Sequence, residues 1–274
     1  PSAIAVSSSY VQVAVFAGPA FAGWIISVYG VSWAFFVNAV GYFVLTCAFL
    51  ALRTPAGYVQ TAPEPGSVLE QIRGGVVYLI RDRRILTLLI LGVLVNAMTV
   101  GTFHMLPAYS ELMLGMGVEG MSIILAIEGI GATLAALWMA RGGAHMATPM
   151  RVVWAVLVAV VAAAALICTP SIYLAAVFAL ALGVAAEVRR TGAMTLVQMN
   201  VEERQRGRVM GSWFMFAQIA GGIGAYGIGH TATSFGLQWP TVIAAGVCIV
   251  VWLCVYINRD ALLFRSTETS QITG

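Results

Sequence analysis

Glu128 is an acidic residue in the middle of a long apolar segment, between Ile127 and Gly129. A charge at the centre of a lipid bilayer costs about 2.5–3.5 kcal/mol on insertion scales, so such a residue needs a function or a partner. A carboxyl group in apolar surroundings can hold a proton and release it when water reaches it, which suits proton coupling. The alternative is a neutral carboxyl that hydrogen-bonds to a neighbouring helix. We take Glu128 as the candidate for proton coupling.

Glu187, Arg189 and Arg190 form a second cluster in an otherwise apolar stretch. Glu187 and Arg190 are three residues apart, so on a helix they lie on one face and can pair. Facing a cavity, the pair would bind a polar or anionic substrate or form a gate. Alternatively the membrane span ends near residue 193, and the two arginines are cytoplasmic anchors.

Asn96 and Gln218 are polar residues within apolar segments. Asn96 is a candidate for substrate contact, and hydrogen bonding between helices is an equally open interpretation. Arg206 and Arg208 precede the segment of Gln218. They belong either to a solvated loop or to a cytoplasmic gate whose salt bridges form and break during transport.

The glycine pattern Gly222-Ile-Gly224-Ala-Tyr-Gly227 matches the dinucleotide fingerprint GxGxxG, but no strand precedes it and no acidic residue follows at the required spacing. The four cysteines lack metal-type spacing, and the chain has no Walker sequence or nucleophile–base arrangement. We therefore expect no catalytic residue, no metal, no cofactor and no nucleic-acid partner. The chain is not expected to be an enzyme, so any work it does must draw on a gradient.

The composition indicates an all-α integral membrane protein. Of 274 residues, 60% are hydrophobic and 9% are charged, and the mean hydropathy is +0.92. Soluble domains carry roughly 25% charged residues. Apolar segments long enough to cross a bilayer occur at residues 8–28, 32–52, 85–106, 119–140, 152–168, 171–193, 209–233 and 239–258.

The arginines predict how these eight spans are oriented. The chain contains 14 basic residues, all arginine, and they lie in alternate connections or at the adjoining ends of the spans. By the positive-inside rule, both ends of the chain and the 54–84 linker are cytoplasmic. Within the linker, the apolar spacing after Ser67 predicts a short helix on the membrane surface.

The first two spans match the last two when the chain is shifted by 206 residues. The shift superimposes Gly18 on Gly224 and Arg53 on Arg259. Spans three to eight would then form a complete six-helix unit. Spans one and two would end an earlier copy, whose first four helices are missing from this chain.

Small residues in the first span provide the strongest motif. Ala14, Gly18 and Ala22 recur at i, i+4 and i+8, which lets another helix approach closely, and Pro19 and Gly23 lie beside them. The segment resembles the antiporter motif GxxxGPxxGG of the fifth helix of major facilitator transporters, with alanine at two of the glycine positions. Further matches are Trp33-Ala34-Phe35, Asn38, Leu106-Pro107, Gly129 to Ala132, Gln198 and Arg206 to Val209.

The chain thus resembles the major facilitator superfamily, in the branch of enterobactin-exporter-like and transmembrane secretion effector proteins. The resemblance implies a polytopic major facilitator fold, truncated at the N-terminus, with helices five to twelve of twelve. The expected division is 1–53 as the last two helices of the N-terminal bundle, 54–84 as linker, 85–259 as the C-terminal bundle and 260–274 as a cytoplasmic tail.

The expected function is a secondary-active, proton-coupled exporter of small amphipathic molecules such as drugs, siderophores or metabolites. It would work by alternating access as a monomer, when full length, in the bacterial inner membrane. The partners would be a small-molecule substrate, protons and the bilayer. The alternatives are uptake or lipid transport by the same fold, or a membrane scaffold or degenerate fragment that transports nothing.

Overall fold

The computed structural model describes residues 21, 25, 29–51 and 68–258, and these residues form helices and no strand. The predicted all-α class is therefore confirmed for this part of the chain. The helices are α2 (Val31–Ala51), α3 (Val68–Arg81), α4 (Arg83–Leu112), α5 (Gly117–Gly142), the 3₁₀ turn η1 (Gly143–Met146), α6 (Pro149–Cys168), α7 (Ile172–Asn200), α8 (Glu203–Phe235) and α9 (Trp239–Ile257).

Six of the described helices, α2, α4, α5, α6, α7 and α9, are long and apolar enough to cross a membrane. Each coincides with a predicted span. α8 coincides with the seventh span, but its glycines and Gln218 make it less apolar than the others. Most of the first predicted span and the motif Ala14, Gly18, Pro19, Ala22 and Gly23 lie outside the described residues.

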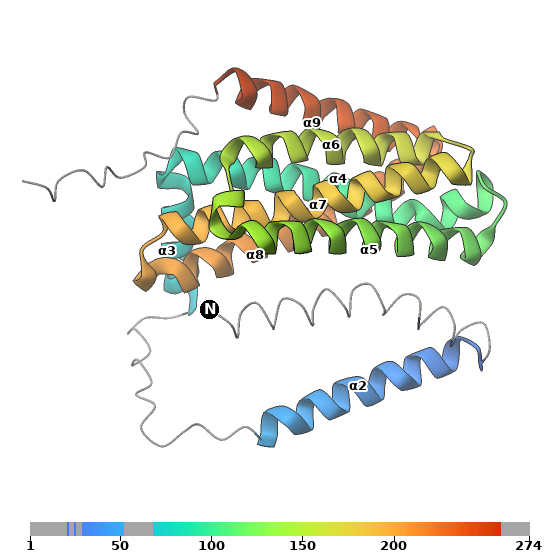
Figure 1. The fold of residues 1–274 in the computed structure, drawn as a ribbon, viewed down its shortest axis with the longest axis horizontal. Coiled ribbons are helices and arrows are strands. Elements are labelled where there is room, and N and C mark those ends of the chain that lie inside the picture. The colour runs from blue at the N-terminus through green and yellow to red at the C-terminus, as the bar shows by residue number, and fades with distance from the viewer. Residues whose placement is uncertain (1–20, 22–24, 26–28, 52–67, 259–274) are drawn as a thin grey trace, which may run out of the picture.

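Helices α4 to α9 run alternately up and down in one bundle (Figure 1). The connections α5–α6 and α7–α8 lie at the end of the bundle where α3 lies, and the other three connections lie at the opposite end. α5 packs along α7, α4 along α8, and α6 against α7 and α9. This antiparallel order follows from the short connections between long helices.

Local sequence signals set where these helices begin and end. Asp82 precedes α4, and its carboxylate accepts hydrogen bonds from the backbone N–H groups of Arg84 (2.8 Å) and Ile85 (3.4 Å). Thr148 caps α6 in the same way, with Pro149 in the first turn. Asp and Thr at these positions satisfy amide donors that the first turn of a helix leaves free. α4 therefore begins directly after Asp82.

Glycine allows two pairs of helices to approach to backbone distance. A Cβ atom at Gly183 of α7 would clash with the carbonyl oxygen of Glu128 in α5. A Cβ at Gly224 of α8 would clash with the carbonyl oxygen of Ala97 in α4. Small residues at such crossings give the close packing that holds helices together in lipid. Of the three fingerprint glycines, Gly224 makes such a contact, whereas nothing lies within 4 Å of a Cβ at Gly222 or Gly227.

Aliphatic side chains of α4, α6 and α7 fill the centre of the bundle. Two polar aromatic side chains there bond to backbone carbonyl oxygens. The Tyr109 hydroxyl donates to the Thr169 carbonyl oxygen (2.6 Å), and Trp252 Nε1 donates to the Val153 carbonyl oxygen (2.7 Å). Because lipid offers no hydrogen bonds, these pairings remove a desolvation cost.

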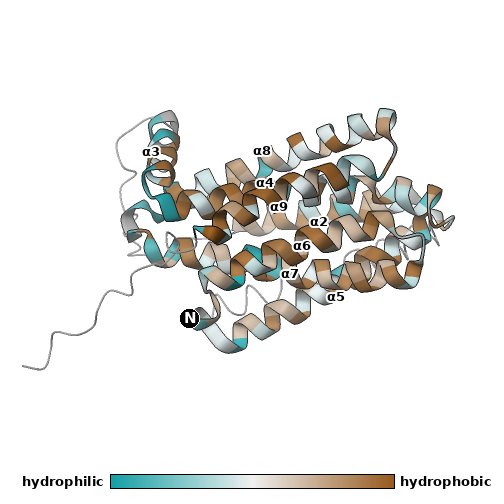
Figure 2. Cartoon of the chain, turned by 90° about the horizontal axis from the view of Figure 1, so that it is seen from above, coloured by the Kyte–Doolittle hydropathy of each residue, from teal (hydrophilic) through white to brown (hydrophobic). Residues whose placement is uncertain are grey.

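α3 packs against α8 and α4 rather than lying on lipid alone. Leu79 is fully buried, and a Cβ at Gly75 would clash with Ser212 and the Arg208 carbonyl oxygen. Ile72 and Ile80 of α3 are exposed. Figure 2 shows hydrophilic residues gathered at the α3 end and hydrophobic residues along the bundle.

α2 is set apart from the bundle in Figure 1. None of its most apolar stretch is buried, and large side chains such as Phe35, Phe43 and Leu50 are exposed. Its apolar surface therefore faces lipid or another protein surface when the chain is in a membrane.

Candidate functional site

Glu187, at the middle of α7, is buried, with 4% of its surface exposed. Its carboxylate accepts hydrogen bonds from Arg190 Nε (3.1 Å) and a terminal Arg190 nitrogen (2.5 Å) on one oxygen. The Thr191 hydroxyl donates to the other oxygen. The predicted pairing of Glu187 with Arg190 is therefore present. Charge-assisted bonds of this kind are what keeps a buried carboxylate tolerable.

The ion pair lies inside a helix and not at its boundary. α7 was predicted to span 171–193, but it continues ten residues past Arg190 to Asn200. At 1.5 Å per residue, the pair lies about 15 Å from the end of α7. The helix thus continues past residue 193, and both interpretations of Arg189 and Arg190, as cytoplasmic anchors or as residues facing a cavity, stay predictions.

Glu128 lies half-buried at the twelfth of the 26 residues of α5. Its backbone packs against Gly183, one turn before Glu187 on the adjoining face of α7. The two carboxyl groups are close enough to interact electrostatically. Tertiary packing thus unites two groups that the sequence separates by 59 residues.

Arg189 occupies a different face of α7. Two residues of a helix turn it by about 200°, so Arg189 and Glu187 project from nearly opposite sides. The Nε of Arg189 is buried and has no hydrogen-bond partner among the described residues. A buried guanidinium nitrogen without a partner is costly. It is the least satisfied ionic group of the cluster.

Arg189 and Arg190 line a cavity of about 130 Å³ between α4, α7 and α8. Its polar lining also includes Asn96 and Gln218, and Trp213 adds an aromatic wall. Asn96 Nδ2 donates to the Ala217 carbonyl oxygen of α8 (2.8 Å), which is the bond between helices expected under one interpretation. Contact of Asn96, Glu187 or Arg190 with a substrate stays a prediction.

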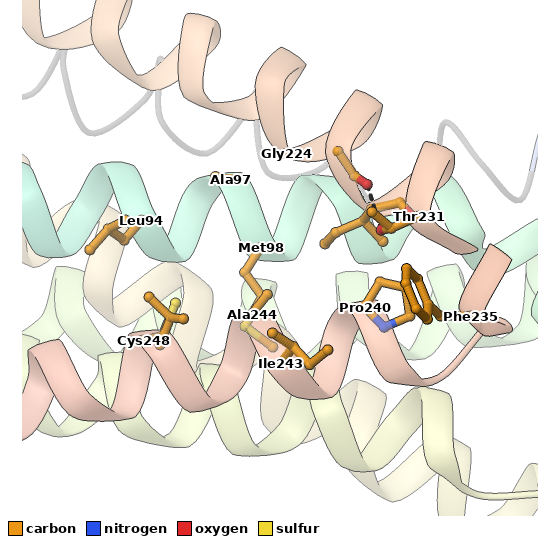
Figure 3. A pocket seen from close by; sticks show the side chains of 13 residues that line it. Leu94, Ala97, Met98, Gly224, Thr231, Phe235, Pro240, Ile243, Ala244 and Cys248 are labelled. Carbon is orange, nitrogen blue, oxygen red and sulfur yellow. Dashed lines mark hydrogen bonds between the residues drawn. The ribbon is translucent and has the colours of Figure 1, made fainter. Parts of the chain in front are cut away.

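A second cavity, of about 350 Å³, lies on the other side of α4, between α4, α8 and α9 (Figure 3). Its lining is apolar and includes Leu94, Met98, Ile243 and Cys248. The Thr231 hydroxyl at its edge donates a hydrogen bond to the Gly227 carbonyl oxygen (2.6 Å). This cavity offers space for apolar groups and no free ionic group.

Arg206 and Arg208 were placed on a loop before the seventh span, but both lie in the first two turns of α8. Arg206 is exposed. Arg208 is half-buried beside Gly74 and Gly75 of α3. The candidate gate residue Arg208 therefore belongs to the contact between α3 and α8.

The chain matches the protein family described as "transmembrane secretion effector" over residues 1–270. The chain belongs to this family. It is therefore a multi-pass membrane protein and a small-molecule transporter of the major facilitator superfamily, as the resemblance predicted. A comparison with curated proteins gave no match.

Two features of this transporter were not found from its sequence. Arg189 was seen only as a neighbour of the predicted pair, although the 200° between positions 187 and 189 signals that they face different surroundings. The second feature is the apolar cavity in Figure 3, which no single residue of the sequence indicates. Gly227 of the GxGxxG pattern lines this cavity, and nothing lies within 4 Å of a Cβ at that position.

Proposed function

We propose that this transporter is a proton-coupled, secondary-active exporter of small amphipathic molecules, with Glu128 as its proton-carrying group. The observation that carries the proposal is the approach of Glu128 to Glu187 across the α5–α7 contact. Ionic groups at membrane depth are expensive, and they mark ion and substrate paths in transporters.

The two cavities beside this cluster support an amphipathic substrate. The cavity of Arg189, Arg190 and Asn96 offers polar groups and an aromatic wall, and the cavity of Figure 3 offers apolar surface. Both share α4 and α8. The polar and the apolar cavity, on the two sides of α4, match the two parts of an amphipathic molecule.

We further propose the division of the chain predicted from its repeat. α2 belongs to the N-terminal bundle, and residues 85–259 form the C-terminal bundle. The exposure of α2 along its apolar length supports this assignment. The protein acts as a monomer in the bacterial inner membrane, with both ends of this chain in the cytoplasm.

Everted membrane vesicles from an export-deficient bacterial host test the function. The vesicles are energised by respiration and supplied with an anionic, a cationic or a neutral amphipathic dye. Wild-type protein is expected to accumulate at least one dye, and a protonophore is expected to abolish the accumulation. The Glu128→Gln variant is expected to lose proton-driven accumulation, because an amide cannot carry the proton.

Glu119→Gln is the matched control, since Glu119 is an exposed carboxylate in the first turn of the same helix. It is expected to transport like the wild type. Unchanged proton-driven transport by Glu128→Gln removes this residue from the coupling mechanism. Dye loss from the vesicles in place of accumulation contradicts export, and no movement of any dye contradicts the transport function proposed here.

A further inference from the structure

We propose that Arg189 binds an anionic group of the transported molecule in the cavity between α4, α7 and α8. The substrates would then be small organic anions that carry an aromatic or apolar part. This inference rests on the proposed transport function and assigns the chemical class of its substrate.

The charges around α7 leave one cation over. Glu187 bonds to Arg190 and attracts Arg189 as well, but one carboxylate can neutralise only one arginine. No ion pair joins Arg189 to any residue in the described part of the chain. Glu128 approaches Glu187 from the α5 side, across α7 from Arg189. The cavity therefore presents a guanidinium without a matched counter-charge.

The geometry of the cavity fits a small anion with a ring. A guanidinium donates parallel hydrogen bonds to a carboxylate or phosphate. Arg189 lines this cavity, and its buried Nε has no hydrogen-bond partner in the described part of the chain. Trp213 and Phe214 provide aromatic surface at the same cavity. Its volume of about 130 Å³ is close to that of a site that holds a benzene ring.

A purely structural role and a ligand-binding role for Arg189 predict opposite effects of its mutation on the melting temperature. An arginine that served packing would be bonded, and its removal would lower the melting temperature. An arginine kept for a ligand costs stability in the empty protein, so a neutral residue of similar length would raise it. We therefore expect Arg189→Met to melt higher than the wild type, by roughly 2–4 °C.

The binding experiment uses the protein in nanodiscs of zwitterionic lipid, titrated with four ring compounds and followed by saturation-transfer difference NMR. The compounds are benzoate, phenyl phosphate, benzyl alcohol and benzylamine. The wild type is expected to bind at least one of the two anions about tenfold more tightly than the alcohol. The better of the two anions identifies the preferred group. Arg189→Gln is expected to lose this preference, and Arg189→Lys to keep part of it.

Arg141→Gln is the matched control, because Arg141 is an exposed arginine in the last turn of α5 and does not line the cavity. It is expected to keep the preference for anions. The inference is overturned if the wild type binds none of the compounds or shows no preference for an anion. It is equally overturned if Arg189→Gln retains the preference, or if Arg189→Met melts lower while binding is unchanged.

Failure of this inference differs from failure of the transport function. If the wild type and Arg189→Gln both transport dyes and prefer the same dye charge, only the anion site is overturned. A preference for anions in a protein that moves no dye overturns only the transport function.

Discussion

Glu187 combines a buried carboxylate with a partner that is itself half exposed. The Arg190 side chain is 53% exposed, so water reaches the guanidinium, whereas the Glu187 carboxylate is shielded. The Thr191 hydroxyl holds the second carboxylate oxygen. This asymmetry means that the pair depends on Arg190 to offset the burial of Glu187, and far less on Glu187 to hold Arg190.

Arg190→Gln is therefore expected to destabilise the protein by about 1–3 kcal/mol, since it leaves a buried carboxylate short of its charge-assisted bonds. Thermal unfolding in detergent measures the change. The double variant Glu187→Gln/Arg190→Gln is expected to regain most of the lost stability, because two amides need no counter-charge.

Transport measurements on the double variant distinguish a structural role of the Glu187–Arg190 pair from a role in transport. If the double variant is stable and exports dye like the wild type, the pair serves only to stabilise α7. If it is stable and does not export dye, the charges act in transport. A double variant that is no more stable than Arg190→Gln contradicts the coupling between the two residues.

At the scale of helices, α4 with α8 and α5 with α7 are joined by backbone contact at glycine. Gly224 and Gly183 lie where an added Cβ would strike a carbonyl oxygen of the facing helix. A carbonyl oxygen belongs to a rigid helix and cannot rotate away as a side chain does. The contact therefore distinguishes sharply between glycine and alanine.

Gly224→Ala is expected to destabilise the bundle by about 1–3 kcal/mol, because the helices must separate to admit the methyl group. Gly222→Ala is the matched control on the same helix, since nothing lies within 4 Å of a Cβ at Gly222. That variant is expected to be neutral or slightly stabilising, as alanine favours the helix. Equal melting temperatures for the two variants contradict the close approach of α4 and α8.

At the scale of the whole molecule, the described arginines at helix ends lie at one end of the bundle. Arg81, Arg141 and Arg151 lie at the end that α3 occupies, and Glu119 lies in the first turn of α5, at the other end (Figure 1). By the positive-inside rule, we expect the α3 end to be cytoplasmic. In a protein that rocks between two states, this end is the one at which α3 contacts α8.

Thiol labelling of intact cells tests the orientation in a variant whose four native cysteines are replaced by serine. An impermeant maleimide added outside is expected to label Glu119→Cys and to leave Arg141→Cys unlabelled, since both positions are exposed and lie at opposite ends. Permeabilised cells are expected to show labelling at both. Labelling of Arg141→Cys alone in intact cells would reverse the orientation.

The sequence by itself determined the helices, their order and the family. Long apolar segments must be helical in lipid, because no water satisfies their backbone groups, and the spacing of glycine and arginine marks packing faces and ends. Glu128, Glu187, Arg190 and Asn96 were singled out because polar groups at membrane depth stand out against an apolar background. All these signals are local, so composition and periodicity reveal them.

Only the tertiary structure decided how these groups combine. It brings Glu128 to Glu187 across the α5–α7 contact, extends α7 beyond Arg190, and leaves Arg189 beside a cavity made by three helices. None of these follows from spacing along the chain, because the approach of helices depends on which glycine meets which carbonyl. Partnership between side chains is set by packing, and packing is a property of the whole bundle.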